Sequence, residues 1–150
     1  LDAVSAVLGI CYERTYEGEP AMKLESLAMK GKNVLELEPF VNDNALDTSS
    51  MILQVFEKRE KHRKEDLAYS AHAYLAKGLG ALALEKALEN GVKIVGFSGG
   101  VACNELLALM MRRIVESAGL TFLTHEAVPP GDGGLSFRQA FTASLESSSV

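Results

Sequence analysis

Two short segments of this 150-residue chain carry the residue types that a ligand-binding site requires. The first is Ser98-Gly99-Gly100-Val101-Ala102-Cys103-Asn104. Its adjacent glycines would let the backbone approach a ligand closely, and N–H groups at the start of a following helix would attract an anion. The Asn104 amide suits a ribose or a base. The spacing fits neither a P-loop nor a dinucleotide fingerprint, and a tight strand-to-helix turn explains the glycines at least as well.

The second segment, Pro129-Pro130-Gly131-Asp132-Gly133-Gly134, holds one carboxylate between flexible residues directly before a helix. Asp132 is therefore a candidate functional group. An aspartate near a helix N-terminus also stabilises that helix, and this segment taken alone favours the helix cap.

The elements that would position these segments alternate between strands and helices. We expect strands at residues 92–97 and 120–124, each followed by one of the two segments. The first of the helices behind them should end at Gly119, and the second should cover residues 135–145. Upstream we expect helices at residues 2–8, about 21–29, from the 47–50 cap region to about 62, and 66–90, with a strand at 34–40. This order indicates an α/β fold with parallel pairing, in which both segments open at one sheet edge.

The composition indicates a single globular domain. A hydrophobic fraction of 47% is enough for a core at this length, and a net charge of −5 argues against independent nucleic-acid binding. The apolar runs are too short to cross a bilayer and no secretory leader is present, so we expect no membrane association and a cytoplasmic location. Cys11 and Cys103 are expected to be reduced thiols. Because Leu1 stands where a methionine would, we expect a piece of a longer chain.

The two segments together resemble the C-terminal end of the HypF carbamoyltransferases of hydrogenase maturation. The resemblance rests on 99–104, on Val128 to Gly134 with Gln139-Ala140, and upstream on Leu1-Asp2-Ala3-Val4, Leu8-Gly9, Tyr16-Glu17-Gly18 and Leu24-Glu25. It covers the chain except residues 33–66. It implies the second lobe of an actin/hexokinase-like (ASKHA, RNase H-like) nucleotide-binding domain, which binds nucleotide between two lobes. Residues 1–150 would be the C-terminal lobe alone, without the upstream lobe.

The same resemblance implies a set of site residues. Asp132 would ligate a divalent metal, iron or zinc, whose other ligands, a pair of histidines three residues apart, are expected outside this chain. His62, His72 and His125 are isolated, and His72 is interpreted as a packed helix residue. The nucleotide, ATP or AMP as carbamoyl adenylate, would be surrounded by Asp2, Gly18, Glu19, Lys23, Gly99, Gly100 and Asn104.

Lys23 departs from the family, whose members usually have an acidic residue there. A helix that starts near Ala21 would place Lys23 in its first turn, where a cation is poorly placed relative to the helix dipole. Two interpretations remain open: Lys23 contacts a phosphate or carbamoyl oxygen, or it points into water.

The resemblance implies a carbamoyltransferase. A companion domain would make carbamoyl adenylate from carbamoyl phosphate and ATP, and this domain would transfer the carbamoyl group to the C-terminal cysteine of a HypE partner. No nucleophile is assigned to this chain, which we expect to be inactive alone. The alternatives are a small-molecule O-carbamoyltransferase, a tRNA threonylcarbamoyl transferase, which the acidic charge disfavours, and a non-catalytic nucleotide-binding or interaction lobe. The absent histidine pair and Lys23 support the last of these.

Overall fold

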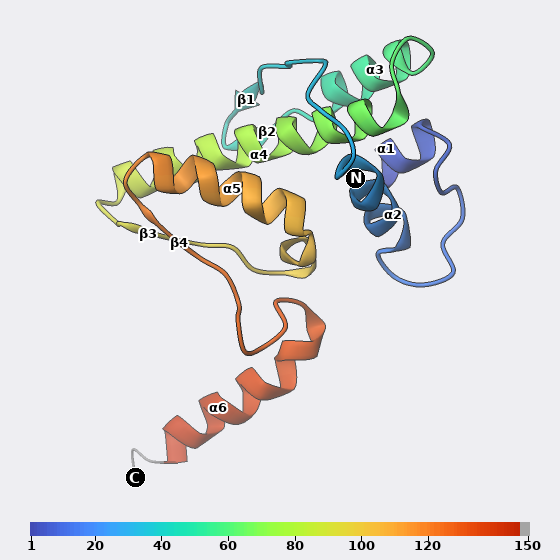
Figure 1. Ribbon diagram of the computed structural model, residues 1–150. Helices are drawn as coiled ribbons and strands as arrows, with labels where there is room; N and C mark the ends of the chain where they lie inside the picture. The colour runs from blue at the N-terminus through green and yellow to red at the C-terminus, as the bar shows by residue number, and fades with distance from the viewer. Residues whose placement is uncertain (148–150) are drawn as a thin grey trace.

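The computed structural model describes residues 1–147. Helices dominate, with two short two-stranded sheets between them (Figure 1). No helix in the described part of the chain is long and apolar enough to span a membrane. The elements are, in order, α1 (Asp2–Val7), α2 (Glu19–Ala28), β1 (Val41–Asn42), β2 (Ala45–Leu46), α3 (Ser49–Lys58), α4 (Lys64–Glu89), β3 (Ile94–Gly96), the 3-10 turn η1 (Gly100–Cys103), α5 (Glu105–Ser117), β4 (Thr121–Leu123), the 3-10 turn η2 (Asp132–Gly134) and α6 (Leu135–Ser147).

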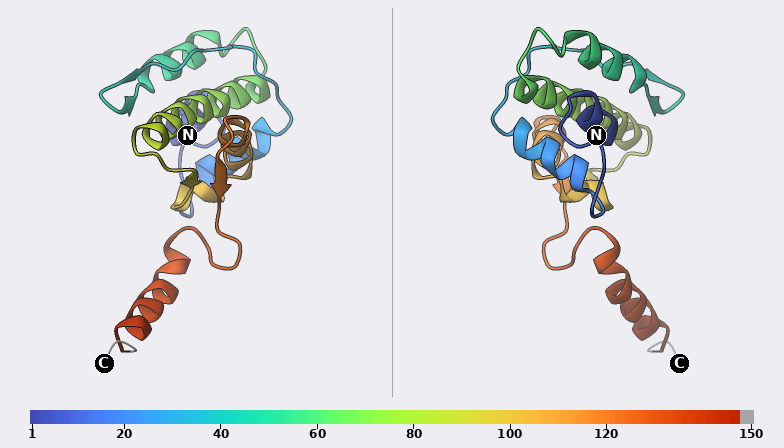
Figure 2. Two further views of the ribbon diagram at one scale, coloured as in Figure 1. Left: turned by 90° about the vertical axis from the view of Figure 1, so that its left-hand side faces the viewer. Right: turned by 90° about the vertical axis from the view of Figure 1, so that its right-hand side faces the viewer.

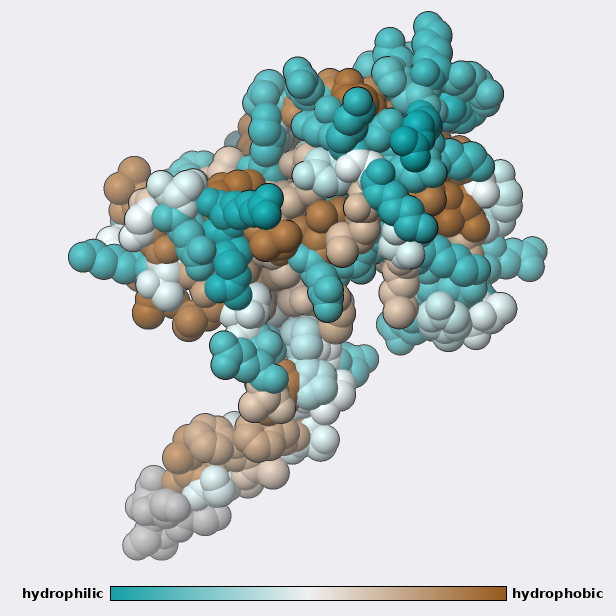
Figure 3. Space-filling model, in the orientation of Figure 1, coloured by the Kyte–Doolittle hydropathy of each residue, from teal (hydrophilic) through white to brown (hydrophobic). Residues whose placement is uncertain are grey.

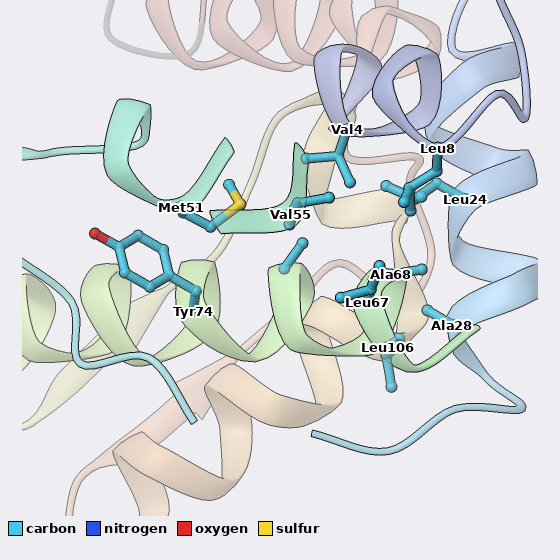
Figure 4. Packing of buried hydrophobic residues seen from close by; sticks show 11 residues of the cluster. Val4, Leu8, Leu24, Ala28, Met51, Val55, Leu67, Ala68, Tyr74 and Leu106 are labelled. Carbon is cyan, nitrogen blue, oxygen red and sulfur yellow. The ribbon is translucent and has the colours of Figure 1, made fainter. Parts of the chain in front are cut away.

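The long helix α4 is the centre of the molecule. Its apolar side chains pack against α1, α2 and α3 in one cluster (Figure 4). Further along, they pack against α5 and the β3–β4 pair in a second cluster. Gly80 lets α5 approach closely, since a Cβ there would lie 2.7 Å from Ile114 Cγ2. The buried residues of the first cluster are Val4, Leu8, Leu24, Ala28, Met51, Val55, Leu67, Ala68, Ala71, Tyr74 and Leu106.

The predicted parallel pairing is confirmed. β3 and β4 run parallel, with Val95 opposite Phe122 and Gly96 opposite Leu123. Helix α5 connects them and ends before Gly119, whose φ of 77° is the left-handed conformation expected of a helix stop. Both strands end at the same edge, which places the two loops that follow them next to each other.

The strand predicted at residues 34–40 is wrong. Its backbone N–H groups bond to side chains of α4 instead of a neighbouring strand: Val34 and Leu35 both donate to Ser70 Oγ, at 3.0 and 3.3 Å. Glu36 has a φ of 47°, and Pro39 has no N–H to donate. The segment therefore packs its apolar side chains onto α4 as irregular chain, and only the small β1–β2 hairpin follows it.

The start of one helix also differs from expectation. Helix α2 begins at Glu19 rather than near Ala21, because Gly18 adopts a φ of 79° as its N-cap and Pro20 fits the first turn.

Helix α6 extends away from the rest of the molecule in all views (Figures 1 and 2). Its surface in Figure 3 is largely apolar, with Leu135, Phe137, Phe141 and Leu145 each more than half exposed.

Candidate functional site

The two glycine-containing loops meet at the carboxyl edge of the β3–β4 pair. The Gly99 N–H donates to the Pro130 carbonyl at 2.9 Å, and a Cβ built on Gly131 would lie 3.6 Å from Gly100 Cα. The prediction that both loops open at one edge is therefore confirmed. In parallel sheets this edge is where ligands bind.

The turn between β3 and η1 contains Gly99 and Gly100. Its backbone requires glycine at position 99, and there is open space where a side chain would stand at either position. Gly99 has a φ of 95° and a ψ of 174°, a region that is essentially restricted to glycine. No atom lies within 4 Å of a Cβ built on Gly99 or Gly100. The backbone here is thus open to a ligand on the side where side chains would otherwise stand.

Asn104 is buried and its side chain already makes two hydrogen bonds. Its Oδ1 accepts from the Leu107 N–H at 2.8 Å and caps α5, while its Nδ2 donates to His72 Nε2 at 3.1 Å. His72 Nδ1 donates in turn to the Ala68 carbonyl at 2.8 Å, so the neutral ring uses both nitrogens. Burial lowers the pKa of His72, although the bond to Ala68 and the charge of Glu25 oppose that shift. The prediction that His72 is a packed residue is confirmed.

Glu25, which the sequence analysis named only as part of the family resemblance, joins two helices. Its Oε1 accepts from the Leu106 N–H at 3.1 Å and thereby ties α2 to the first turn of α5. A carboxylate satisfies an otherwise unpaired helix N–H and complements the positive end of the helix dipole. The start of α5 is consequently held by Asn104 and Glu25, which come from different parts of the chain.

The start of α2 forms a separate polar cluster. Glu19 accepts from the Thr15 hydroxyl at 3.0 Å and from the Thr15 N–H, and pairs with Lys23 Nζ at 2.7 Å. The Lys23 hydrogen bond, followed by the Thr15 N–H, lowers the pKa of Glu19 to about 2. The same bond raises the pKa of Lys23. Lys23 is the fifth residue of α2, so its expected place in the first turn is wrong, and the anion beside it here is Glu19.

Asp2 and Asp132 are both exposed carboxylates. Asp2 lies in the first turn of α1 and Asp132 opens η2, and neither side chain has a hydrogen bond or ion pair within residues 1–147. In the same range no three histidine, cysteine or acidic side chains are grouped closely enough to hold a metal ion. Asp132 therefore offers one carboxylate without a partner in residues 1–147, and it directly follows Gly131, which lies against the glycine turn.

The structure thus assembles the site residues in groups. Gly99 and Gly100 lie against the Asp132 loop, Gly18 and Glu19 lie with Lys23, and Asn104 is tied indirectly to α2 through α5 and Glu25. Asp2 makes no bond to any of the others.

A second feature missed from the sequence is the pair Ser98 and His125. Ser98 Oγ lies 2.8 Å from His125 Nε2, and both side chains are exposed. Each residue comes two positions after the end of its strand, β3 or β4. That equivalent position on two adjacent parallel strands is the signal from which the pair could have been found.

Comparison with known proteins finds carbamoyltransferases. The model of the family described as "Carbamoyltransferase, Kae1-like Domain, second subdomain" matches residues 1–139. The chain is 39% identical over 140 residues to a probable carbamoyltransferase HypF of Methanocaldococcus jannaschii, covering 93% of this chain and 18% of that protein. It is 31% identical over 134 residues to a tRNA N6-adenosine threonylcarbamoyltransferase of Thermococcus gammatolerans, with 88% and 38% covered.

Solved structures agree. The crystal structure of T. kodakarensis HypF superposes with a TM-score of 0.83 at 41% identity, covering 98% of this chain and 20% of that one. A full-length HypF in the phosphate- and nucleotide-bound form gives a TM-score of 0.82 at 28% identity, with 93% and 19% covered. The chain therefore spans about a fifth of each of these three HypF proteins.

Proposed function

Because the chain belongs to the Kae1-like carbamoyltransferase family, as the second subdomain, we propose that it forms the nucleotide-binding lobe of a HypF-type carbamoyltransferase. In this proposal the enzyme transfers a carbamoyl group from carbamoyl adenylate to the C-terminal cysteine of a HypE-like partner. The observation that carries it is the contact between the Gly99 turn and the Pro130 loop, which forms one open edge beside Asp132.

The glycine turn is the part of this lobe that would approach the nucleotide most closely. Gly99 and Gly100 leave the backbone uncovered, so a phosphate or a ribose can approach without a side-chain clash. A preorganised backbone donor in such a turn also stabilises negative charge that develops on an oxygen during transfer. The bond from Gly99 to Pro130 holds the turn in place for this purpose.

Asn104 and the start of α2 would complete the nucleotide contacts. Asn104 retains one amide hydrogen beyond its bonds to Leu107 and His72, and that hydrogen is the group we assign to the adenosine. The α2 cluster of Gly18, Glu19 and Lys23 presents a carboxylate acceptor and an ammonium donor, which suit ribose hydroxyls and phosphate respectively. Asp2 is assigned to the same surface from the family resemblance.

Asp132 fits a metal ligand, because its carboxylate is exposed and makes no other bond within residues 1–147. A divalent cation held there, iron or zinc, would polarise a carbamoyl or phosphate oxygen as a Lewis acid. Asp132 itself would supply one negatively charged oxygen ligand from the residue after Gly131, which lies against the glycine turn.

We propose further that this chain contributes half of an active site. It spans about a fifth of the HypF proteins of M. jannaschii and T. kodakarensis, and within residues 1–147 no three histidine, cysteine or acidic side chains are grouped closely enough to hold a metal ion. The purified chain should therefore bind AMP weakly and transfer no carbamoyl group, whereas a full-length polypeptide that contains it should do both.

Carbamoyl adenylate and a peptide ending in cysteine test this directly, with mass spectrometry detecting the carbamoylated thiol. Transfer to the cysteine peptide by the full-length protein would support the proposal. Transfer only to tRNA-bound adenosine, or nucleotide binding without any transfer, would support the two alternatives instead. Turnover by the isolated chain at the full-length rate would contradict the half-site proposal.

A further inference from the structure

The Ser98–His125 pair is the one exposed hydroxyl–imidazole pair at the ligand edge of the described residues, and the roles above do not use it. Its 2.8 Å hydrogen bond joins the first residue of one glycine-containing loop to the segment that leads into the other. Gly99 directly follows Ser98, so the pair borders the turn to which the nucleotide is assigned. An imidazole held by a hydrogen bond beside a substrate is the usual arrangement of a general base.

The surrounding bonds indicate where the proton of the pair lies. The Ser98 hydroxyl has one hydrogen, and its oxygen lies 3.5 Å from the Pro130 carbonyl, which can only accept. With the hydroxyl donating to Pro130, its oxygen accepts the Nε2–H of His125. The neutral imidazole then carries its lone pair on Nδ1, which has no hydrogen-bond partner within residues 1–147. In this arrangement Ser98 holds the His125 tautomer in which Nδ1 carries the lone pair.

The other two histidines do not offer such a nitrogen at this place. His72 is fully buried and both of its ring nitrogens are bonded, to Ala68 and Asn104. His62 lies between α3 and α4, in a segment that Figure 1 shows well away from the β3–β4 edge. Among the described residues, His125 is therefore the imidazole available to a group that arrives at the two loops.

We propose that His125, oriented by Ser98, accepts the proton that the acceptor thiol loses during carbamoyl transfer. This role rests on the proposed function. The thiol sulfur forms a bond to the carbamoyl carbon, and the bond from that carbon to the AMP phosphate oxygen breaks. AMP leaves with the electron pair of that bond, and the thiol proton passes to His125 Nδ1 and then to solvent. Neither Ser98 nor His125 forms a covalent bond with the substrate.

The experiment uses a full-length HypF polypeptide that carries this chain as its second subdomain. His125→Ala removes the base, and His125→Gln keeps a donor to Ser98 but cannot accept the proton. Both should lower kcat/KM for transfer to a cysteine-terminated peptide by about 10²- to 10⁴-fold, the usual contribution of a general base. AMP affinity, measured by calorimetry, should stay within twofold. Added imidazole should restore part of the rate of His125→Ala, a response that a purely structural role would not give.

Variants of Ser98 separate orientation from proton transfer. Ser98→Thr keeps the hydroxyl and should retain most of the rate, whereas Ser98→Ala should lose about tenfold. His62→Ala serves as the matched control and should behave as the unaltered protein does. Undiminished transfer by His125→Gln would overturn the role, as would a parallel loss of AMP affinity with no rescue by imidazole. If the unaltered protein transfers no carbamoyl group, the proposed function itself fails and this role fails with it.

Discussion

His72 and Asn104 form a buried side-chain pair that joins the first half of α4 to the residue before α5, with 3.1 Å between Nε2 and Nδ2. Through Asn104, the pair also fixes the cap of the helix that follows the glycine turn. A residue in the interior of the fold thus determines the orientation of an amide at the candidate site.

Removing the imidazole should destabilise the fold. His72→Ala would leave a cavity and an unpaired donor on Asn104, and we expect a loss of about 2–4 kcal/mol in the free energy of unfolding. Urea denaturation followed by circular dichroism measures this change. His62→Ala, which alters an exposed histidine, should change stability by less than about 0.5 kcal/mol. Equal effects of the two substitutions would show that the His72 bonds contribute little.

His72 should also make stability depend on pH. Burial lowers its pKa below the ordinary 6.5, so in the acidic range the unfolded state binds a proton that the folded state does not. Stability from this group is then fully present above pH 6.5 and is lost as the pH falls below it. Between pH 7.5 and 5.5, the free energy of unfolding should therefore fall more steeply with decreasing pH for the unaltered chain than for His72→Gln. Parallel curves would contradict this assignment.

The two glycines of the turn should respond differently to alanine. Gly99→Ala forces a side chain into a conformation restricted to glycine and should destabilise the protein by about 1–3 kcal/mol. Gly100→Ala meets no atom within 4 Å and should leave stability nearly unchanged. If nucleotide approaches this backbone, Gly100→Ala should nevertheless weaken AMP binding. Calorimetry with AMP on a stable Gly100→Ala protein is the decisive measurement, and unchanged affinity would place the nucleotide elsewhere.

Lys23→Met should raise the pKa of Glu19 from about 2 towards its ordinary value, because the Lys23 hydrogen bond is the largest cause of the shift. The Thr15 bonds remain, so the pKa should stay below 4.5. Glu19 stabilises the fold above pH 4.5 and loses that contribution as the pH falls towards 2, and Lys23→Met should reduce it. A carbon-detected NMR titration of the Glu19 carboxyl measures the shift directly.

The same variant tests the proposed phosphate contact. If Lys23 also reaches a phosphate, Lys23→Met should weaken AMP binding several-fold, equivalent to about 1 kcal/mol, and leave adenosine binding unchanged. Equal affinities of both ligands before and after the substitution would confine Lys23 to its pair with Glu19.

Asp132→Asn should reduce the metal content of the full-length protein and its transfer rate, because an amide oxygen carries no negative charge. Thermal unfolding should change little, since Asp132 makes no bond within residues 1–147. Glu126→Gln, a neutralised carboxylate in the preceding segment, serves as the control. Full metal content in Asp132→Asn, together with a stability loss of about 0.5–2 kcal/mol, would support a helix cap instead.

The sequence was sufficient to predict the β3–α5–β4 unit and its two loops, because short apolar runs followed by glycines are local signals. It was misleading at residues 34–40, where we expected a strand. The backbone N–H groups of Val34 and Leu35 bond to Ser70, a helix side chain about 35 residues away. No local sequence pattern predicts such a partner. The bond of Glu25 to Leu106 was not predicted for the same reason, since the two residues are 81 positions apart. To predict the Ser98–His125 pair, one would need to know the end of each strand to within one residue. The pattern of hydrophobic residues does not define the strand ends that accurately.

The register of β3 on β4 has a consequence for the spacing of polar groups at the loop edge. Adjacent residues of a strand are about 3.3 Å apart, so a slip of one residue would carry His125 that far from Ser98 and break their bond. The same slip would turn Phe122, only 3% exposed, from the interior to the solvent, and would separate it from Phe97, whose ring centre lies 6.2 Å away. The packing of Phe97 against Phe122 therefore fixes the register of the two strands, and the register sets the distance between Ser98 and His125 at the edge of the sheet.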